Sequence, residues 1–345
     1  MVDTFLKNSD NQRQTDRQTD RQIVSIIDFE RVKKAAANTS PYMWYQWVDE
    51  VLRQKDCFIM PPKLHLGQDE GDYFNVMPTI FTKNNVAMVK MIGRHSIKHG
   101  EHRSVMMGDL LLYEADTGIL KTLMDAEYIT TLRTGAVAAH SAVLFARKNF
   151  QVMSLIGLGN IMKVFFRTFI EAAKSLAILP NQLTVKLYKH HSQEVQFAKE
   201  FSNIPFLKFV YCDSYEDTIT DSDIVVSAVT KASNNFASDK CFKKGVTVIP
   251  ICTMGFQNCD LFFDKVFSDE IAQIRGFKYF NSFKSVAEVS DVLKGKVKGR
   301  SDESERILVY NYGIAAQDLY FALKLYPFCA ENQISYHYPT SKYFI

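Results

Sequence analysis

The strongest constraint on this chain is a glycine turn that joins a short apolar run to a helical pattern. Residues 152–156 (VMSLI) are long enough for a strand buried on both faces, and Gly157-Leu158-Gly159 follows directly. Apolar residues at spacings of three and four then predict a helix over residues 160–173. In this arrangement a backbone can approach a pyrophosphate, which rests on the helix N-terminus. The turn is therefore a candidate dinucleotide site, and its alternative is an ordinary strand–helix turn that binds nothing.

The glycine fingerprint is incomplete, because Met162 stands at the third glycine position of the G-x-G-x-x-G pattern. Gly157 permits the tight turn, and Gly159 leaves no side chain between the backbone and a phosphate. We interpret Met162 as a variation in helix packing.

The chain beyond the turn alternates in the βαβ manner. Short apolar runs at 183–188, 209–211, 223–229 and 246–251 predict strands, with a helix over 193–201. Such alternation favours a parallel sheet with helices on both faces.

Basic residues follow the second strand expected in this sheet. Where a dinucleotide-binding domain usually carries an acid for the ribose hydroxyl, the chain reads Tyr188-Lys189-His190-His191. The positive charge of Lys189 would suit the 2′-phosphate of NADP; alternatively, these side chains simply face solvent. Both NAD and NADP are therefore candidate cofactors.

Composition describes an ordinary globular protein and argues against several classes of partner. The 345 residues suffice for two domains, and 47% of them are hydrophobic and 23% charged. A net charge of +3 gives no argument for nucleic acid or for a membrane surface. Six scattered cysteines without a C-x-x-C pair suggest neither a disulfide framework nor a zinc ribbon, and no apolar run approaches membrane-spanning length. We therefore expect a cytoplasmic protein.

Two further segments give little indication of function. Residues 8–22 repeat Arg-Gln-Thr-Asp without an apolar side chain, so we expect residues 1–22 to form a disordered polar tail. His95, His99 and His102 are spaced like a metal-binding face, but no acid or cysteine is spaced with them. We predict no metal site.

Two cations in the first half are candidates for binding an anionic substrate. Lys90 lies in a predicted strand, 86–92, either snorkelling to water from an edge strand or aimed at a substrate carboxylate. Arg133 and Thr134 lie in a helix predicted from Asp125, beside small residues that let a neighbouring helix or a ligand come close.

Several motifs occur together in an order that resembles one family, the ornithine cyclodeaminase/μ-crystallin family, over roughly residues 40–327. The most specific is a T-x-x-R-T-G/A-A segment around Arg133, followed about twenty residues later by the glycine turn. The motifs are Met60-Pro61-Pro62-Lys63, Met77-Pro78, Lys90, Gly108-Asp109-Leu110-Leu111-Leu112, Asp116-Thr117-Gly118, Ile129–Ala136, Ile156–Asn160 and Val309–Leu319.

The resemblance implies an α/β fold with two domains. A Rossmann dinucleotide-binding domain, residues 141–304, would be inserted in a discontinuous α+β substrate-binding and dimerisation domain, residues 23–140 plus 305–345. It also implies a homodimer, a nicotinamide cofactor (NAD or NADP), and a small-molecule amino acid or cyclic imine as substrate.

The resemblance also implies site residues by position. Lys90 and Arg133 match the lysine and arginine that hold the substrate carboxylate, and Lys63 stands near a family arginine with the same task. Met77 completes the expected substrate-binding set. Cofactor contacts are expected at Thr134, Gly157, Gly159, Asn160, Ile161, Lys189, Ala228 and Thr230.

One departure concerns catalysis. Family cyclodeaminases carry an aspartate just after the strand that corresponds to 246–251, whereas Thr253 or Met254 stands there in this chain. Neither side chain can act as a general base near neutral pH. Asp260 is the nearest acid, so either Asp260 reaches in or the amine chemistry differs from that of ornithine. Lys90 and Asp260 are the candidate catalytic residues.

Three functions fit the resemblance. The first is an ornithine cyclodeaminase-like ammonia-lyase, which uses NAD to convert L-ornithine or a related amino acid to L-proline and ammonia through an imine. The second is an NAD(P)H-dependent ketimine reductase or amino acid dehydrogenase, which the missing acid and the charge of Lys189 favour. The third is a non-catalytic, μ-crystallin-like NAD(P)-binding protein.

Overall fold

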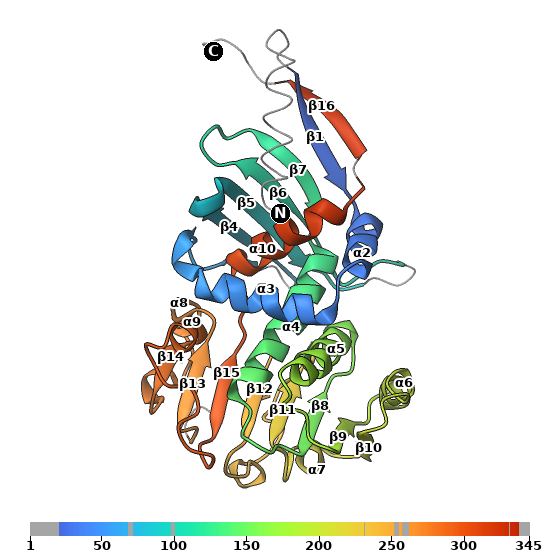
Figure 1. The fold of residues 1–345 in the computed structure, drawn as a ribbon, viewed down its shortest axis with the longest axis vertical. Coiled ribbons are helices and arrows are strands. Elements are labelled where there is room, and N and C mark those ends of the chain that lie inside the picture. Colours follow the sequence, from blue (N-terminus) through green and yellow to red (C-terminus); the bar gives the residue numbers. More distant parts are fainter. Residues whose placement is uncertain are drawn as a thin grey trace. The chain divides into compact units, whose positions relative to one another are not determined.

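The computed structural model describes residues 21–67, 72–97, 101–230, 232–251, 255–256, 262–330 and 332–337. By its contacts the chain forms two compact units (Figure 1). Unit 1 comprises residues 1–40, 54–130 and 314–345, and unit 2 comprises residues 41–53 and 131–313.

Unit 2 is built on an eight-stranded sheet with the order β10-β9-β8-β11-β12-β15-β13-β14 (Figure 1). Every pairing described in it is parallel, which confirms the predicted parallel sheet. All residues of β11, β12 and β15 are buried, as expected of strands covered on both faces. The strands are β8 (Val152–Ile156), β9 (Leu183–Tyr188), β10 (Leu207–Cys212), β11 (Ile224–Ser227), β12 (Thr247–Pro250), β13 (Lys265–Ser268), β14 (Val286–Glu288) and β15 (Ile307–Tyr310).

The strand order of this sheet reverses beside β8, because β9 lies on one side of it and β11 on the other. In open parallel sheets, the crevice outside the carboxyl ends of the strands at such a point is where ligands bind. Since β8 ends at Ile156, the glycine turn begins at this crevice.

Helix α5 of unit 2 packs along the apolar stripe that the sequence pattern predicted. Helix α5 buries Met162, Phe165, Phe166 and Phe169, so the third fingerprint position is a core position. Helix α3 packs against α5 and α9. The helices are α3 (Pro41–Arg53), α4 (Glu127–Phe145, which begins in unit 1), α5 (Asn160–Ser175), α6 (Gln193–Glu200), α7 (Tyr215–Ile219), α8 (Ile271–Ile274) and α9 (Val289–Leu293).

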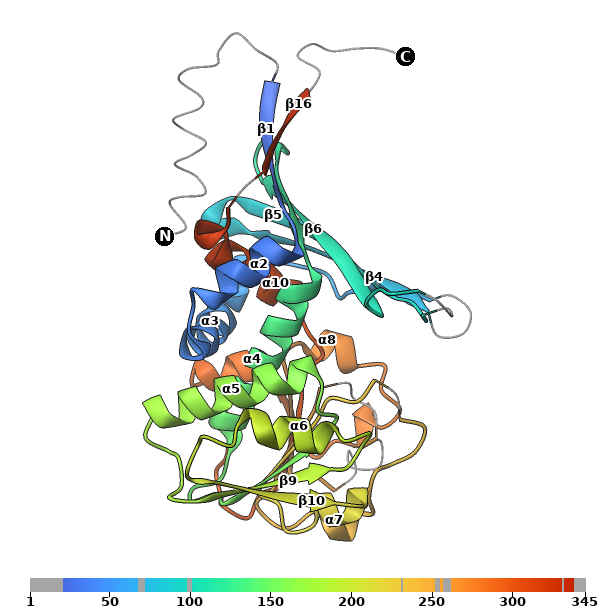
Figure 2. The ribbon, with the colours of Figure 1, turned by 90° about the vertical axis from the view of Figure 1, so that its right-hand side faces the viewer.

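Unit 1 is built on a mixed sheet with the order β16-β1-β7-β6-β5-β4-β2, in which β3 also pairs with β4. Its described pairings are antiparallel except that of β1 with β7. Helices α2 (Phe29–Ala37) and α10 (Ala315–Leu325) lie on one side of the sheet (Figure 2). The strands are β1 (Arg21–Ile27), β2 (Phe58–Ile59), β3 (Leu64–Gly67), β4 (Tyr73–Phe81), β5 (Val86–Arg94), β6 (Met106–Glu114), β7 (Leu120–Asp125) and β16 (Asn332–His337).

Side chains of this sheet alternate between a buried and an exposed face. On β5, Val86, Met88, Lys90 and Ile92 point to the buried side, where α10 contacts β4 and β5. Val89 and Met91, which lie between them, face outward and are exposed. Thus the only charged side chain in the inward row of β5 from Val86 to Ile92 is Lys90.

The structure corrects one reading of Lys90. As an edge-strand residue it could have snorkelled to water, but β5 lies between β4 and β6, and Lys90 is 0% exposed. The snorkelling interpretation is therefore wrong, because local alternation does not reveal where a strand sits in its sheet.

The borders of the two units differ from those predicted at 140/141 and 304/305. Contacts divide the chain at 130/131 and 313/314, and residues 41–53 join unit 2 because α3 packs on α5 and α9. Strand β15 pairs with β12 and β13, which moves the second border past it. Arg21 and Gln22, assigned to the tail, are the first residues of β1, and the rest of the tail lies outside the described residues.

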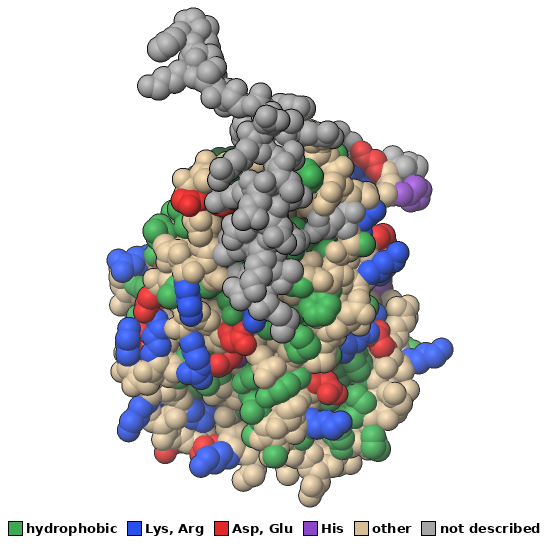
Figure 3. All heavy atoms as spheres, turned by 45° about the horizontal axis from the view of Figure 1, so that its top comes forward, with side chains coloured by type: hydrophobic (Ala, Val, Ile, Leu, Met, Phe, Trp, Pro, Cys, Tyr) green, Lys and Arg blue, Asp and Glu red, His purple; other side chains and the backbone are tan. Residues whose placement is uncertain are grey.

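On the face shown in Figure 3, basic and acidic side chains are interspersed. Among the helices of the described residues, none combines the length and apolar character needed to cross a lipid bilayer.

Candidate functional site

The glycine turn after β8 is held by a close backbone approach. Gly157 has a φ of 82°, in the left-handed region, and a Cβ added there would lie 2.8 Å from the carbonyl carbon of Ala228. Ala228 in turn donates its backbone N–H to the oxygen of Ile156 at 2.8 Å. Only glycine fits this position without strain.

The second glycine leaves an open space at the start of α5. Gly159 is the N-cap residue of α5 with an ordinary φ of −77° and no side-chain cap. Apart from its own neighbours along the chain, no atom of the described residues lies within 4 Å of the position that its Cβ would take. The N–H groups of the first turn lack intrahelical partners by geometry, and Asn160 there is exposed. A helix N-terminus of this kind fits a pyrophosphate.

The segment after β11 continues this edge of the sheet. Ala228 is half-buried and Thr230 is exposed, so both predicted cofactor residues follow a strand that adjoins β8. Ser227, which the sequence interpretation missed, is fully buried, and its hydroxyl has no hydrogen-bond partner among the described residues. A serine inside an apolar strand gave no recognisable signal.

The end of β9 is less basic than its sequence suggests. Lys189 Nζ lies 2.8 Å from Asp213 Oδ1, at the end of the neighbouring strand β10. The hydrogen bond with Asp213 raises the pKa of Lys189. His190 donates its backbone N–H to Glu194 Oε2 at 3.1 Å. A 2′-phosphate at Lys189 would therefore meet a carboxylate that already binds this ammonium.

Arg133 packs against the loop that follows β15. Gly313 has a φ of 86°, and a Cβ there would lie 2.5 Å from Nη1 of Arg133, so the guanidinium rests directly on the glycine. Asp269 fixes this loop from the end of β13: its Oδ2 accepts the backbone N–H of Gly313 at 2.6 Å, and its Oδ1 that of Tyr312 at 3.2 Å. Arg133 and Thr134 are 7% and 9% exposed, so the environment of Arg133 is largely fixed by the protein.

Helix α4, which carries Arg133 and Thr134, is anchored to α3 by a polar cluster. Asp49 accepts hydrogen bonds from Nε2 of the buried His140 at 3.3 Å and from Arg53 Nε at 2.6 Å. Burial acts to raise the pKa of Asp49, but the hydrogen bonds from His140 and Arg53 outweigh it and lower that pKa to about 2. Arg53 also donates to the carbonyl oxygen of Leu293, which ties α9 to the same cluster.

Unit 1 contains the other predicted cation. Lys90 Nζ lies 2.8 Å from Asp318 Oδ1, and both side chains are 0% exposed. Met77 stands directly opposite Lys90 in the β4–β5 register and is 3% exposed. Lys63 is half-buried in the segment between β2 and β3. The structure thus places Met77 beside Lys90 and adds Asp318, which the sequence interpretation missed because it is remote along the chain.

Some expected residues are not described. Asp260, Thr253 and Met254 lie outside the described residues, so the prediction for Asp260 stays a prediction. The described residues contain no cluster of His, Cys, Asp or Glu that could hold a metal ion.

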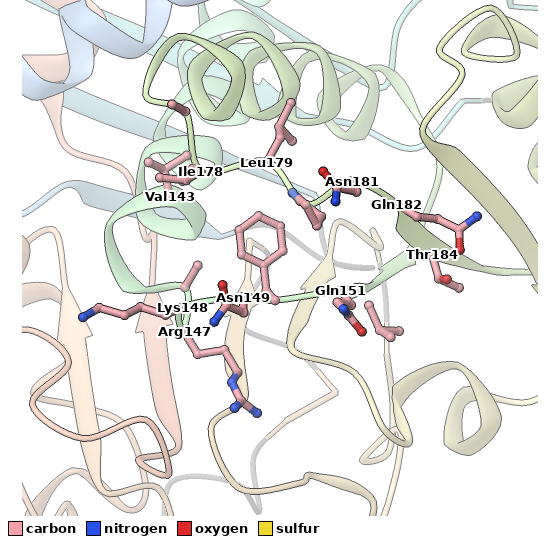
Figure 4. Close-up of a pocket in the computed structure, with 15 residues that line it drawn as sticks. Val143, Arg147, Lys148, Asn149, Gln151, Ile178, Leu179, Asn181, Gln182 and Thr184 are labelled. Atoms are coloured by element: carbon pink, nitrogen blue, oxygen red, sulfur yellow. The ribbon is translucent and has the colours of Figure 1, made fainter.

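A cleft of about 800 Å³ lies at the opposite edge of the parallel sheet (Figure 4). Its walls come from the loops before β8 and β9, with residues such as Arg147, Gln151, Ile178 and Gln182. None of the predicted site residues lines it. Because ligands of such sheets bind at the carboxyl ends of the strands, we do not assign this cleft to the cofactor.

Comparison with known proteins finds relatives that are similar to most of this chain. A nodulation efficiency protein, NfeD, of Rhizobium meliloti is 25% identical over 76% of this chain and 82% of that protein. An N-((2S)-2-amino-2-carboxyethyl)-L-glutamate dehydrogenase of Staphylococcus aureus is 23% identical over 80% of this chain and 86% of that protein. The structure of an archaeal alanine dehydrogenase dimer with bound NAD superimposes with a TM-score of 0.75 at 19% identity, covering 91% of this chain and 99% of that one.

The structural likeness shows a shared α/β fold, and the family is shown by the sequence itself. The model of the ornithine cyclodeaminase/mu-crystallin family matches residues 29–332, which span the glycine turn, Lys90 and Arg133. This chain belongs to the ornithine cyclodeaminase/mu-crystallin family.

Proposed function

We propose that this protein binds NAD or NADP and catalyses a net oxidation or reduction at the carbon–nitrogen bond of a small amino acid. In the reductive direction, a 2-imino acid, a reduced nicotinamide and a proton give the amino acid and the oxidised nicotinamide. The observation that carries the proposal is the open glycine turn at the N-terminus of α5, at the carboxyl edge of a parallel sheet. When bound, a nicotinamide supplies the hydride to the imine carbon or accepts it from the amino acid.

The residues of unit 2 have distinct roles in this proposal. Gly157, Gly159 and Asn160 hold the pyrophosphate through backbone N–H groups, and the segment from Ala228 continues the cofactor surface. Arg133 binds the substrate carboxylate, because a guanidinium pairs with a carboxylate through two parallel hydrogen bonds. The loop fixed by Asp269 supports Arg133 in one position, which reduces the entropy lost on binding.

Net redox chemistry is favoured over ornithine cyclodeamination by the chain itself. Residues 251–254 read Ile-Cys-Thr-Met, without the acid that family cyclodeaminases carry after this strand. The reduction of an imine releases no ammonia, so it does not need that acid for this step. Two of the compared proteins are named as dehydrogenases, one of a glutamate derivative and one of alanine.

Cofactor consumption tests the proposal. We expect the purified protein to oxidise NADH or NADPH stoichiometrically when given Δ1-pyrroline-2-carboxylate or pyruvate with ammonia, followed by the nicotinamide absorbance. Formation of proline and ammonia from ornithine, without net change in NAD, would instead support the cyclodeaminase predicted first from the sequence. Cofactor binding without turnover on these substrates or ornithine would support the non-catalytic alternative.

The substitution Arg133→Ala tests whether Arg133 binds the substrate in this assay. Loss of a bidentate charged contact is expected to raise KM for the imino acid about tenfold or more while the Kd of NADH stays unchanged. Unaltered KM in this variant would remove Arg133 from the substrate site.

Gly159→Ala separates cofactor binding from stability. The added methyl group projects into open space, so we expect the melting temperature to fall by no more than about 3 °C. The same methyl group would stand between backbone and phosphate, so affinity for NADH, measured by nicotinamide fluorescence, should fall about tenfold. Gly276→Ala is the matched control, because Gly276 also has open space around it and lies outside the turn. Equal NADH affinity in the two variants would contradict the phosphate assignment.

Asp213 and Lys189 are expected to set the choice between NAD and NADP. Asp213→Asn should raise affinity for NADPH relative to NADH by about fivefold, because it releases Lys189 from a surface ion pair. Lys189→Asp should lower it. Fluorescence titration with both cofactors measures the ratio, and Glu216→Gln, an exposed acid of the next helix, serves as control. If neither substitution changes the ratio of the affinities for NADPH and NADH, Lys189 does not contact the 2′-phosphate and only faces solvent.

We also propose a homodimer formed through the outward face of the unit 1 sheet. Large apolar side chains are exposed there on neighbouring strands: Ile80 on β4, Val89 and Met91 on β5, and Met107 on β6. Contiguous exposed apolar surface of this kind is typical of an interface. A second copy of the chain is the favoured occupant, since the archaeal alanine dehydrogenase is described as a dimer.

Val89→Glu tests the dimer. The wild-type protein should sediment at twice its 39.5 kDa chain mass, and a charge introduced in the centre of the apolar face should shift it to monomer. Val195→Glu is the control, because Val195 is also exposed but lies on α6 of unit 2. Dimers that persist in Val89→Glu and dissociate in Val195→Glu would place the interface elsewhere.

A further inference from the structure

The cleft at the amino edge of the parallel sheet is separate from the crevice at the glycine turn. Its walls are the loop from α4 to β8 and the loop from α5 to β9, and its volume is about 800 Å³ (Figure 4). Strand β8 begins at the cleft with Val152 and ends at Ile156, directly before the glycine turn. A strand of this length spans about 15 Å, so a small ligand in the cleft does not reach the turn.

The charged side chains that line the cleft are basic. Arg147 and Lys148 belong to the lining, and no Asp or Glu occurs among the lining residues that the structure describes. The other polar side chains of the lining are amides and one hydroxyl: Asn149, Gln151, Asn181, Gln182 and Thr184. Positive charge without an acid in the same lining favours an anionic ligand.

The guanidinium of Arg147 has unused capacity for hydrogen bonds. It faces the buried Asp223, but Nη1 lies 3.7 Å from Oδ1, which is too long for a hydrogen bond. Lys243 already matches the charge of Asp223, because its Nζ lies 2.7 Å from the same oxygen. Nε of Arg147 is buried and has no hydrogen-bond partner among the described residues. Since the Arg147 side chain is 34% exposed, it can still bind an anionic group that enters the cleft.

The second wall of the cleft is apolar. Ile178, Leu179 and Pro180 form it in the loop after α5, and Figure 4 shows Ile178 and Leu179 above Arg147 and Gln151. Ile178 is held in place by its backbone N–H, which donates to the carbonyl oxygen of Ala173 at 2.9 Å. Its side chain is nevertheless 38% exposed. This wall can therefore cover an apolar group of a ligand.

We propose that this cleft is a second ligand site, which binds a small organic anion with its charged group at Arg147 and its apolar part against Ile178 and Leu179. A neutral ligand would leave the charge of Arg147 without a partner, and an inorganic anion would leave the apolar wall in water. The volume lies within the range of about 300–1,000 Å³ that is usual for small-molecule sites. The inference does not depend on the proposed redox function, because none of the residues assigned to that function lines the cleft.

Phenyl phosphate is a suitable probe, because it joins a phosphate to a planar apolar group. Titrated calorimetrically into the full-length protein, it should bind saturably with a Kd of about 1 mM or lower. Inorganic phosphate and phenol, which each carry one half of the probe, should bind about tenfold more weakly. No saturable binding of phenyl phosphate, or inorganic phosphate bound as tightly as the probe, overturns the inference.

Two measurements separate the cleft from the glycine turn. The Kd of phenyl phosphate should be unchanged in the presence of excess NADH. It should also be unchanged in Gly159→Ala, because Gly159 lies at the other end of β8 and α5. If NADH or Gly159→Ala abolishes binding of the probe, the probe occupies the glycine turn and the inference is wrong.

Arg147→Gln tests the basic wall. Loss of the guanidinium should weaken phenyl phosphate binding about tenfold. Arg167→Gln is the matched control, because Arg167 is an exposed arginine of α5 outside the cleft, and this variant should keep the wild-type Kd. A wild-type Kd in Arg147→Gln overturns the inference.

Ile178→Glu keeps the inference testable if Arg147→Gln fails to fold, since Ile178 is exposed. The new carboxylate repels the probe and removes the apolar contact, so its binding should weaken about tenfold or more. Leu176→Glu is the matched control, because Leu176 is 42% exposed, lies two residues earlier in the chain and does not line the cleft. Equal Kd values for phenyl phosphate in these two variants overturn the inference.

Discussion

The approach of two backbones at Gly157 is the contact on which unit 2 depends. A Cβ at this position would lie 2.8 Å from the carbonyl carbon of Ala228, so the turn after β8 and the segment after β11 meet at a distance that only glycine allows. The contact holds the carboxyl ends of two adjacent central strands together where the strand order reverses. The crevice for a dinucleotide is thus a result of backbone packing, and Gly159 keeps its entrance open.

Gly313 makes a second close approach, in this case to a side chain. Gly313 lies so close to Arg133 that a methyl group would overlap the guanidinium, and Asp269 binds the backbone N–H groups of residues 312 and 313. Arg133 is therefore supported by main chain, which cannot change rotamer. A cation held in this way is preorganised for a planar anion, which supports its proposed role.

Local patterns predicted the elements well, and distant partners escaped them. The strands β8 and β9 were predicted with their observed bounds, because apolar runs and flanking turns define them. Asp318 and Asp213 were not predicted as partners of Lys90 and Lys189, since each pair depends on which strands or helices become neighbours. The same limit produced the incorrect edge-strand interpretation of Lys90 and the shifted borders of the two units.

Each face of the unit 1 sheet departs from the usual pattern, in which the covered face is apolar and the uncovered face is polar. Its covered face contains a charged pair, Lys90 with Asp318, while its uncovered face exposes apolar side chains such as Val89 and Met91. A sheet that only needed stability would carry the reverse arrangement, apolar inside and polar outside. Departures from local rules concentrate at functional sites, where stability is exchanged for binding. The outward apolar surface of β4, β5 and β6 supports the proposal that a second subunit covers it.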